Sequence, residues 1–410
     1  MSCARKLINN VLVVILFLPA LLAAHETSAE ELGALVSHRL GYMKAVAAYK
    51  WLNQLPIENQ AREQLVLSSA VRQGLRHKLT RSSSEHFFKL QIEAAKEVQS
   101  YWFEKWQNDP VSVPATVADL DGEIRPALLR LGEDITAGLA TLPTKLDIDP
   151  VEGLSQNTRT RLSLAAKAVE VYPNQLVQVL DSGVLRVGTT GDYAPFSLQG
   201  DPPDRHGTRS GIDIDLAKNL ANSLGVEIEW VQTSWPNLMA DLHRGRYDIG
   251  MSGISVDARR QQTAFFSKAY HRGGKSAIVR CSDKNSFTSL KSIDKPSTRL
   301  IVNPGGTNQA FVNANIRQAM ITVHDDNRTI FEEIIQRKAD VMITDQIEVR
   351  LQISRHPQLC AALGSETLTT LEKAFLMPQD IVWNAYVDTW LGQRLDDGLV
   401  GAVFDKHTRN

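Results

Sequence analysis

The sequence is poor in cysteine and has almost no excess of charge of either sign. Its 410 residues include three cysteines, and 45 lysines and arginines stand against 46 aspartates and glutamates, for a net charge of −1. Without a positive excess there is no global field to attract nucleic acid, so any anion must be bound locally. The ten histidines are scattered, and neither H-E-x-x-H nor C-x-x-C occurs. We therefore assign no metal and no cofactor.

Long hydrophobic runs are absent beyond the first residues. The run Val11–Ala23 follows Arg5 and Lys6, is too short to span a bilayer comfortably, and precedes several small residues. This pattern is typical of a secretory signal peptide cut near Ala24 or Ala29, with an uncleaved anchor as the alternative. We predict that the first 29 residues are removed and that the mature protein is periplasmic and free of the membrane.

Export also bears on the cysteines. Cleavage removes Cys3 and leaves Cys281 and Cys360, and an even count in an exported protein predicts one disulfide between them. The length predicts two or three domains, and 43% hydrophobic with 22% charged residues is the composition of a folded globular protein.

Two halves of the mature chain have different hydrophobic periods. Residues 30–172 repeat apolar side chains at helical spacing and predict an all-α domain. Its expected helices are 31–53, 56–79, 82–106, 120–142 and 158–171, the third opened by a capping box of Ser82 and Glu85. Residues 173–410 alternate short apolar strands with helices, which predicts an α/β domain.

An internal echo divides the α/β domain further. Leu242–Met251 resembles Ile335–Ile343, each a helix end, a turn and a buried strand. Two similar lobes follow, about 174–276 with 374–410 and about 277–373, with a ligand crevice at the carboxyl ends of their strands. The predicted fold class is therefore multidomain, an all-α domain followed by a two-lobed α/β domain.

The helical half carries candidate anion ligands. Arg39 and Lys50 are about three turns apart on one predicted helix face, where they could converge on one anion or form a solvated basic face. Gln99 occupies a seam of otherwise apolar residues that ends at Trp106. A buried amide must find partners, so Gln99 either sets helix register or faces a ligand.

Motifs in this half resemble the exported, all-helical chorismate mutases. They are Arg39, Ala48–Trp51, Leu55–Glu58 with Arg62-Glu63, and Gln91 to Gln99 before Trp106. The resemblance covers about residues 30–172 and implies that cations clamp the two carboxylates of chorismate, that Glu63 contacts its hydroxyl, and that Gln99 donates to the ether oxygen. The implied cations are Arg39, Lys50, Arg62 and Arg125. Two departures are Asn59, where an acidic residue is frequent, and Gln99, where some exported members have glutamate; an amide donates at any pH.

Motifs in the α/β half resemble the periplasmic amino-acid-binding proteins. They are Gly191–Ser197, Gly211–Asp215, Met251–Ser255 with Arg260, and Pro304–Asn308 before a helix. In that family the arginine and backbone amides, here those near Ser252 and Gly253, hold a ligand carboxylate, and a helix N-terminus on the other lobe completes the clamp.

The α/β half is most similar to a catalytic offshoot of that family, the cyclohexadienyl (prephenate/arogenate) dehydratases. Thr189–Tyr193, Thr233–Met239, Val302–Asn308 and Thr344–Glu348 carry the resemblance over nearly all of 174–410. It implies Glu348 as the general acid. The other implied site residues are Lys275 and Asn303 beside the acid, Arg260 and Thr307 at carboxylates, Tyr193 and Trp235 around the ring, and Asp345 where simple binding proteins hold an amino group.

Together the halves predict an exported bifunctional enzyme that converts chorismate to prephenate, and prephenate to phenylpyruvate, with arogenate as a further candidate substrate. Homodimerisation through the helical half is also expected. The alternative is a non-catalytic solute receptor whose helical half is a dimerisation module. Lys50 with Gln99, and Lys275 with Glu348, favour the enzyme.

Overall fold

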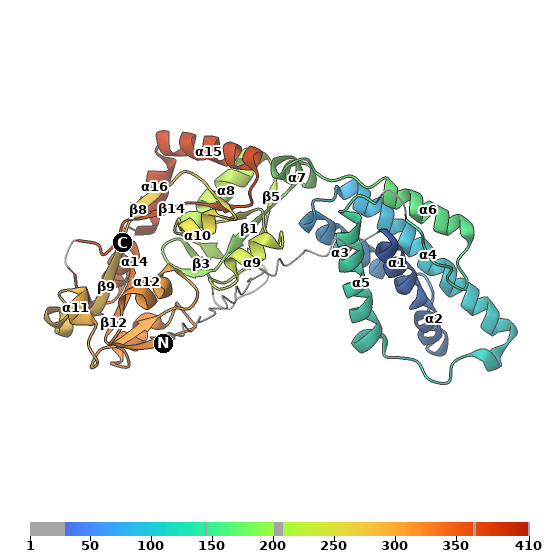
Figure 1. Ribbon diagram of the computed structural model, residues 1–410, viewed down its shortest axis with the longest axis horizontal. Coiled ribbons are helices and arrows are strands. Elements are labelled where there is room, and N and C mark those ends of the chain that lie inside the picture. The colour runs from blue at the N-terminus through green and yellow to red at the C-terminus, as the bar shows by residue number, and fades with distance from the viewer. Residues whose placement is uncertain (1–28, 144–145, 201–207, 364–365, 409–410) are drawn as a thin grey trace, which may run out of the picture.

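A computed structural model of the protein describes residues 29–143, 146–200, 208–363 and 366–408. Residues 1–28 of the predicted signal peptide lie outside these ranges. A helical part, blue to green in Figure 1, is followed by an α/β part with two sheets, so the predicted fold class is confirmed. Within the described ranges, no helix is long and apolar enough to cross a membrane.

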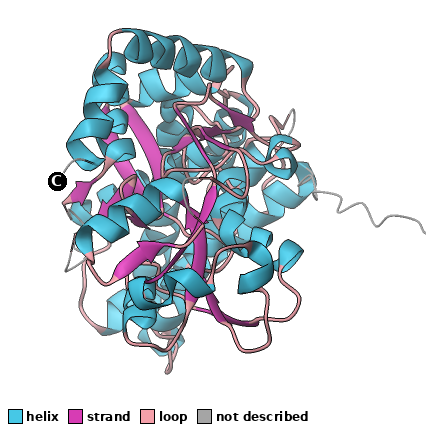
Figure 2. Ribbon diagram, turned by 90° about the vertical axis from the view of Figure 1, so that its left-hand side faces the viewer, coloured by secondary structure: helices cyan, strands magenta, loops and turns pink. Residues whose placement is uncertain are grey.

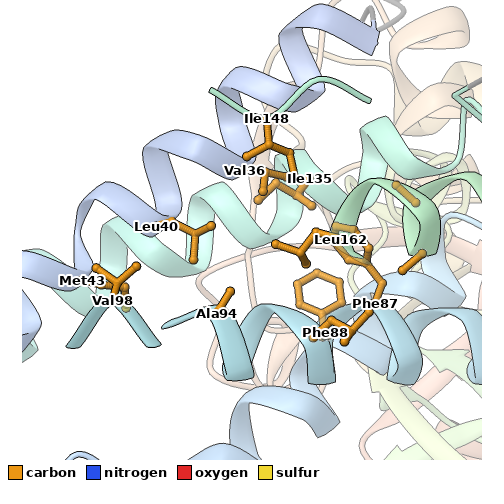
Figure 3. Close-up of a cluster of buried hydrophobic side chains, with 14 of the residues drawn as sticks. Val36, Leu40, Met43, Phe87, Phe88, Ala94, Val98, Ile135, Ile148 and Leu162 are labelled. Carbon is orange, nitrogen blue, oxygen red and sulfur yellow. The ribbon is translucent and has the colours of Figure 1, made fainter. Parts of the chain in front are cut away.

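The helical part is built around its longest helix. The elements are α1 (Ala29–Gly41), α2 (Met43–Leu52), α3 (Gln60–Arg76), α4 (Arg81–Asn108), α5 (Arg125–Leu139) and α6 (Gln156–Lys167), with the short turns η1 (Pro110–Ser112) and η2 (Leu120–Ile124). Helix α4 packs against α2, α3 and α6. Figure 3 shows Phe87 and Phe88 of α4 beside Leu162, and Val36 beside Ile135. These side chains are almost fully buried, so the apolar stripes found in the sequence form one core.

Helix boundaries differ from the prediction in two places. The single helix expected over 31–53 is divided at Tyr42 into α1 and α2, although Tyr42 itself keeps a helical backbone. The N-cap of α4 is Thr80, not Ser82 as predicted, because the Thr80 hydroxyl accepts the Ser83 N–H. Glu85 instead forms an ion pair with Arg81 one turn earlier.

The α/β part contains two five-stranded sheets. The first has the order β5-β1-β6-β15-β7 and the second β11-β10-β12-β9-β13. The first sheet's strands are β1 (Val184–Thr189), β5 (Glu227–Gln232), β6 (Ile249–Gly250), β7 (Phe265–Phe266) and β15 (Leu376–Met377). The second sheet's strands are β9 (Lys275–Arg280), β10 (Arg299–Val302), β11 (Met320–Val323), β12 (Val341–Asp345) and β13 (Leu359–Ala361). Strands β8 (His271–Gly273) and β14 (Leu371–Lys373) pair where the chain passes between the lobes.

Helices cover both sheets, as the strands flanked by helices in Figure 2 show. They are α7 (Gln175–Ser182), α8 (Ile212–Leu224), α9 (Leu238–His243), α10 (Ala258–Gln261), α11 (Leu290–Ile293), α12 (Thr307–Asn315), α13 (Ile330–Ile335), α14 (Gln346–Arg355), α15 (Ile381–Asp396) and α16 (Leu399–Thr408), with the turn η3 (Cys281–Ser286). A small third sheet consists of β2 (Asp192–Tyr193), β3 (Ser197–Gln199) and β4 (Arg209–Ser210). These strands lie between β1 and β5 along the chain.

The two similar sequence segments, Leu242–Met251 and Ile335–Ile343, form the same arrangement of a turn and an ion pair in both lobes. Asp248 accepts from the backbone N–H and the guanidinium of Arg186 on β1, and Asp340 does the same for Arg299 on β10. Three residues before each aspartate the backbone has positive φ, at Gly245 and Arg337. Each lobe therefore fixes a helix-to-strand turn to its neighbouring strand through a buried or half-buried ion pair. The cysteines pair as the count predicts, since Cys281, directly after β9, is bonded to Cys360 of β13.

Candidate active sites

The first cavity lies within the helical part and has a volume of about 180 Å³. Helices α1 to α5 contribute to its wall, together with the loop before α3. The structure brings all seven residues predicted for the first site to this wall. They are Arg39, Lys50, Asn59, Arg62, Glu63, Gln99 and Arg125. Arg39 lies on α1 and Lys50 on α2, and both line the cavity.

Positive charge dominates this cavity. Burial lowers the pKa of Arg39 to about 10. Burial also lowers the pKa of Lys50, opposed by the charge of Glu63 and assisted by that of Arg125. For Arg62, burial and then the neighbouring Arg125 lower the pKa. Since burial destabilises the charged forms of Arg39, Lys50 and Arg62, a bound dianion would relieve an existing electrostatic cost.

Gln99 faces the cavity from α4. Its Nε2 donates to the carbonyl of Ala95 at 2.9 Å and lies 3.7 Å from the Met43 sulfur. Among the described residues its buried Oε1 has no hydrogen-bond partner. The amide therefore lies on the cavity wall, which favours the ligand-facing alternative over a purely register-setting role. Its unused capacity is that of an acceptor, so donation to a ligand would use the Nε2–H that now faces the Met43 sulfur.

Three polar residues of the first cavity, Ser69, Gln73 and Lys96, were not predicted. Lys96 lies one turn before Gln99 and pairs with Glu63 at 3.3 Å and Glu58 at 3.4 Å. Gln73 of α3 also lines the cavity. The three-residue spacing of Lys96 and Gln99 would have placed Lys96 on this helix face. Nothing in the sequence distinguishes Gln73 from an ordinary surface glutamine.

The second cavity lies between the two lobes and is small, about 20 Å³, because the lobes are closed on one another. Seven predicted residues line it, namely Tyr193, Trp235, Gly253, Arg260, Asn303, Thr307 and Asp345. The predicted residues Lys275, Glu348 and Ser252 do not line it. The Ser252 hydroxyl instead contacts the Ser197 hydroxyl at 2.6 Å and accepts the Thr190 N–H at 3.1 Å.

A charged network centred on Asp345 closes this cleft. One carboxylate oxygen accepts from Lys275 Nζ at 2.6 Å and the other from Lys373 Nζ at 2.5 Å and from the Tyr193 hydroxyl. Burial alone would raise the pKa of Asp345, but the two ammonium groups outweigh it and hold that pKa well below its usual range. Lys275 also donates to Thr307 at 3.0 Å. Asp345 is therefore fully occupied by groups of the protein itself.

Glu348 lies directly behind this network, in the first turn of α14. Its side chain is 1% exposed and accepts a hydrogen bond from the Thr344 hydroxyl. Burial raises the pKa of Glu348 to about 8, and the charge of Asp345 adds to that effect, whereas Thr344, Lys275 and Lys373 work against it. The sequence alone does not show whether burial or the neighbouring Lys275 has the larger effect on this pKa. In the structure burial has the larger effect, so the Glu348 carboxyl is protonated at neutral pH.

Five residues of the second cavity were not predicted as site residues, namely Ser255, Gly306, Asn308, Asn327 and Lys373. Asn308 follows Thr307 in a motif already recognised, so proximity could have suggested it. Lys373 carries no such signal, since Leu371-Glu372-Lys373 has the composition of an exposed strand. No cluster of three or more potential metal ligands occurs among the described residues.

Comparison with known proteins gives two family matches. Residues 185–409 match the model described as bacterial extracellular solute-binding proteins, family 3, and residues 29–100 match chorismate mutase type II.

Individual relatives agree with the larger match. The cyclohexadienyl dehydratase of Pseudomonas aeruginosa is 47% identical over 237 residues, 58% of this chain and 87% of that protein. The L-cystine-binding protein TcyJ of Escherichia coli is 28% identical over 187 residues, 45% of this chain and 68% of that protein. The crystal structure of the ancestral amino acid-binding protein AncCDT-1, a precursor of cyclohexadienyl dehydratase, has a TM-score of 0.52 and 29% identity, covering 58% of this chain and all of that one.

Proposed function

The chain belongs to family 3 of the bacterial extracellular solute-binding proteins, and we propose that it is a bifunctional enzyme, a chorismate mutase joined to a cyclohexadienyl dehydratase. The helical part rearranges chorismate to prephenate, and the two-lobed part converts prephenate to phenylpyruvate. One observation carries the proposal. A single chain holds both a cavity lined by cations and an amide, and a closed cleft between its lobes with a buried carboxyl of raised pKa, Glu348, directly behind the cleft wall.

The mutase step suits the first cavity because it needs no nucleophile and no proton transfer. Chorismate must be held in a folded conformer, and negative charge that develops on its ether oxygen must be stabilised as that C–O bond breaks. We assign the two carboxylates to the cavity's cations, the substrate hydroxyl to Glu63, and the ether oxygen to Gln99 and Lys50. The assigned carboxylate ligands are Arg39, Lys50, Arg62 and Arg125. Asn59 contributes by capping α3, since its side chain accepts the Arg62 N–H.

The dehydratase step needs one positioned acid. Loss of CO2 leaves an electron pair that completes the aromatic ring as the C–O bond breaks, and the departing hydroxyl leaves as water after taking a proton. We assign that proton to Glu348, which then regains it from solvent. Asn303 lines the cleft, and Lys275 lies behind it, bonded to Thr307 and Asp345. We assign carboxylate binding to Arg260, the Gly253 backbone and the N-terminus of α12 at Thr307. Tyr193 and Trp235 pack edge to face and form the wall for the ring.

The alternative, a receptor for amino acids, is weakened by Asp345. A receptor of that kind would use this carboxylate to hold the ligand's ammonium group. Here both oxygens already accept hydrogen bonds from two lysines and a tyrosine, so an ammonium group would have to displace them. The cleft is better suited to an anion without an ammonium group, as prephenate is.

We further propose that residues 1–29 are a cleaved signal peptide, that 30–172 form the mutase domain and 173–410 the dehydratase domain, and that the mature protein acts in the periplasm. The family match to extracellular proteins supports export. N-terminal sequencing of the periplasmic fraction tests this, and an intact Met1 on a membrane-bound form would contradict it.

The decisive experiment is to incubate the purified protein with chorismate and follow chorismate, prephenate and phenylpyruvate together. We expect chorismate to disappear and phenylpyruvate to form, and arogenate supplied separately tests the second substrate. If neither reaction occurs and the protein binds free amino acids instead, the receptor alternative is correct.

A further inference from the structure

The guanidinium of Arg39 is held by a neutral side chain. Its Nη1 donates to Oε1 of Gln91 at 2.9 Å, from α1 to α4. Gln91 is fully buried and lies eight residues before Gln99 on the same helix, but it does not itself line the cavity. Gln91 therefore contacts Arg39 from behind the cavity wall, whereas Arg39 itself lines the cavity.

Three other cations of this cavity, Lys50, Lys96 and Arg125, have acidic neighbours, whereas none is found for Arg39 among the described residues. Arg125 forms an ion pair with Asp121, and the charge of Glu63 acts on Lys50. Burial alone accounts for the lowered pKa of Arg39, and no carboxylate of the described residues offsets it. Arg39 therefore keeps an uncompensated charge while its position is fixed by an amide.

This combination suits a residue that must bind a carboxylate. A carboxylate at position 91 would form a buried ion pair with Arg39 and compete with the substrate, whereas an apolar side chain would leave the guanidinium without its acceptor. An amide fixes the guanidinium without neutralising it. We propose that Gln91 is a positioning residue of the mutase that keeps the charge of Arg39 available to a substrate carboxylate. This inference rests on the mutase function proposed above.

Three substitutions at this position test the proposal. Gln91→Glu keeps the size and adds a charge, and we expect it to raise the chorismate KM at least ~10-fold at neutral pH, with a smaller change in kcat, because the new carboxylate competes for Arg39. Gln91→Met keeps the volume and removes the acceptor, and we expect KM to rise about 2- to 10-fold, the range of one neutral hydrogen bond. Gln91→Asn, which can restore the acceptor if the backbone adjusts, should lie closer to the parent than Gln91→Met.

The control is Gln107→Glu, which adds the same charge at an exposed position near the end of α4. It should leave KM unchanged, and dehydration of added prephenate should be unchanged in all variants. Circular dichroism checks the helical part, and if Gln91→Glu does not fold, Gln91→Met decides the question. A parental KM in the folded variants would overturn the positioning role while leaving the mutase function intact. A parent protein without mutase activity would instead refute the function itself.

Discussion

Replacing Glu348 by glutamine removes one transferable proton from the dehydratase cleft and changes little else. The side chain is 1% exposed, and an amide oxygen can still accept the Thr344 hydrogen bond. Because the native carboxyl is already protonated and neutral at pH 7, the exchange neither adds nor removes a buried charge. We expect Glu348→Gln to fold and to bind prephenate, but to lose at least ~100-fold in dehydration rate, the lower range for general-acid catalysis.

The pH dependence gives the same prediction an independent test. Burial raises the pKa of Glu348 from 4.5 to about 8, so the acid form persists through neutral pH and is lost above about 8. The dehydration rate of the parent should therefore fall as pH rises through 8. The stability follows the same sign, since a raised folded-state pKa stabilises the fold below about 4.5 and loses that contribution as pH rises towards 8. The drop in melting temperature from pH 5 to pH 8 should be smaller in Glu348→Gln than in the parent.

The assay supplies chorismate and measures both products. Glu348→Gln should accumulate prephenate, because the mutase cavity is untouched, whereas the parent should form phenylpyruvate. Glu332→Gln, an exposed change in the same lobe, is the matched control and should behave as the parent. Phenylpyruvate formation by Glu348→Gln at the parental rate would show that another group supplies the proton.

Three further outcomes are expected. Lys50→Met should lower mutase turnover by at least ~100-fold, the effect of removing one charge-stabilising group, and leave dehydration of added prephenate unchanged; equal loss of both activities would indicate misfolding instead. Gln99→Glu should retain mutase activity only at acidic pH, where the carboxyl can donate, and a pH-independent variant would show that this side chain does not serve the ether oxygen. Cys360→Ser should lower the free energy of unfolding by about 4 kcal/mol, the chain-entropy value for a loop as long as that closed by Cys281 and Cys360, as chemical denaturation would measure. Two free thiols in the denatured, unreduced parent protein would contradict the disulfide.

The first site could be predicted from the sequence because its residues project from regular helices. Helical spacing places Arg39 and Lys50 on one face, and the resemblance adds the residues of α3 and α4. The division of the first helix at Tyr42 could not be predicted, since Tyr42 is not a helix-breaking residue and itself keeps helical dihedral angles. The cap of α4 was misassigned because Thr80 and Ser82 are equally good capping residues, and only the backbone path selects Thr80.

The second site is harder to predict from the sequence, because its main contacts join segments that are far apart along the chain. Lys373 is 4% exposed only because β14 pairs with β8 at the passage between the lobes, which brings its Nζ to Asp345. Neither the residue spacing nor the composition of Leu371–Lys373 predicts that β14 pairs with β8. The protonation state of Glu348 was likewise open, because Lys275 and burial act in opposite directions and only the geometry gives their relative size.

The two cavities differ in whether their buried charges are paired within the protein. This difference agrees with the chemistry assigned to each cavity. The mutase cavity leaves Arg39 without a counter-charge, so a dianionic substrate supplies the missing partner and no proton needs to move. The dehydratase cleft satisfies its central carboxylate internally, with Lys275 and Lys373 on Asp345, and so preserves a neutral acid at Glu348 beside strongly charged groups. If the lysines faced Glu348 alone, they would stabilise its carboxylate and remove the proton that the reaction needs. We therefore propose that Asp345 serves to occupy Lys275 and Lys373, so that the neighbouring Glu348 can remain an acid.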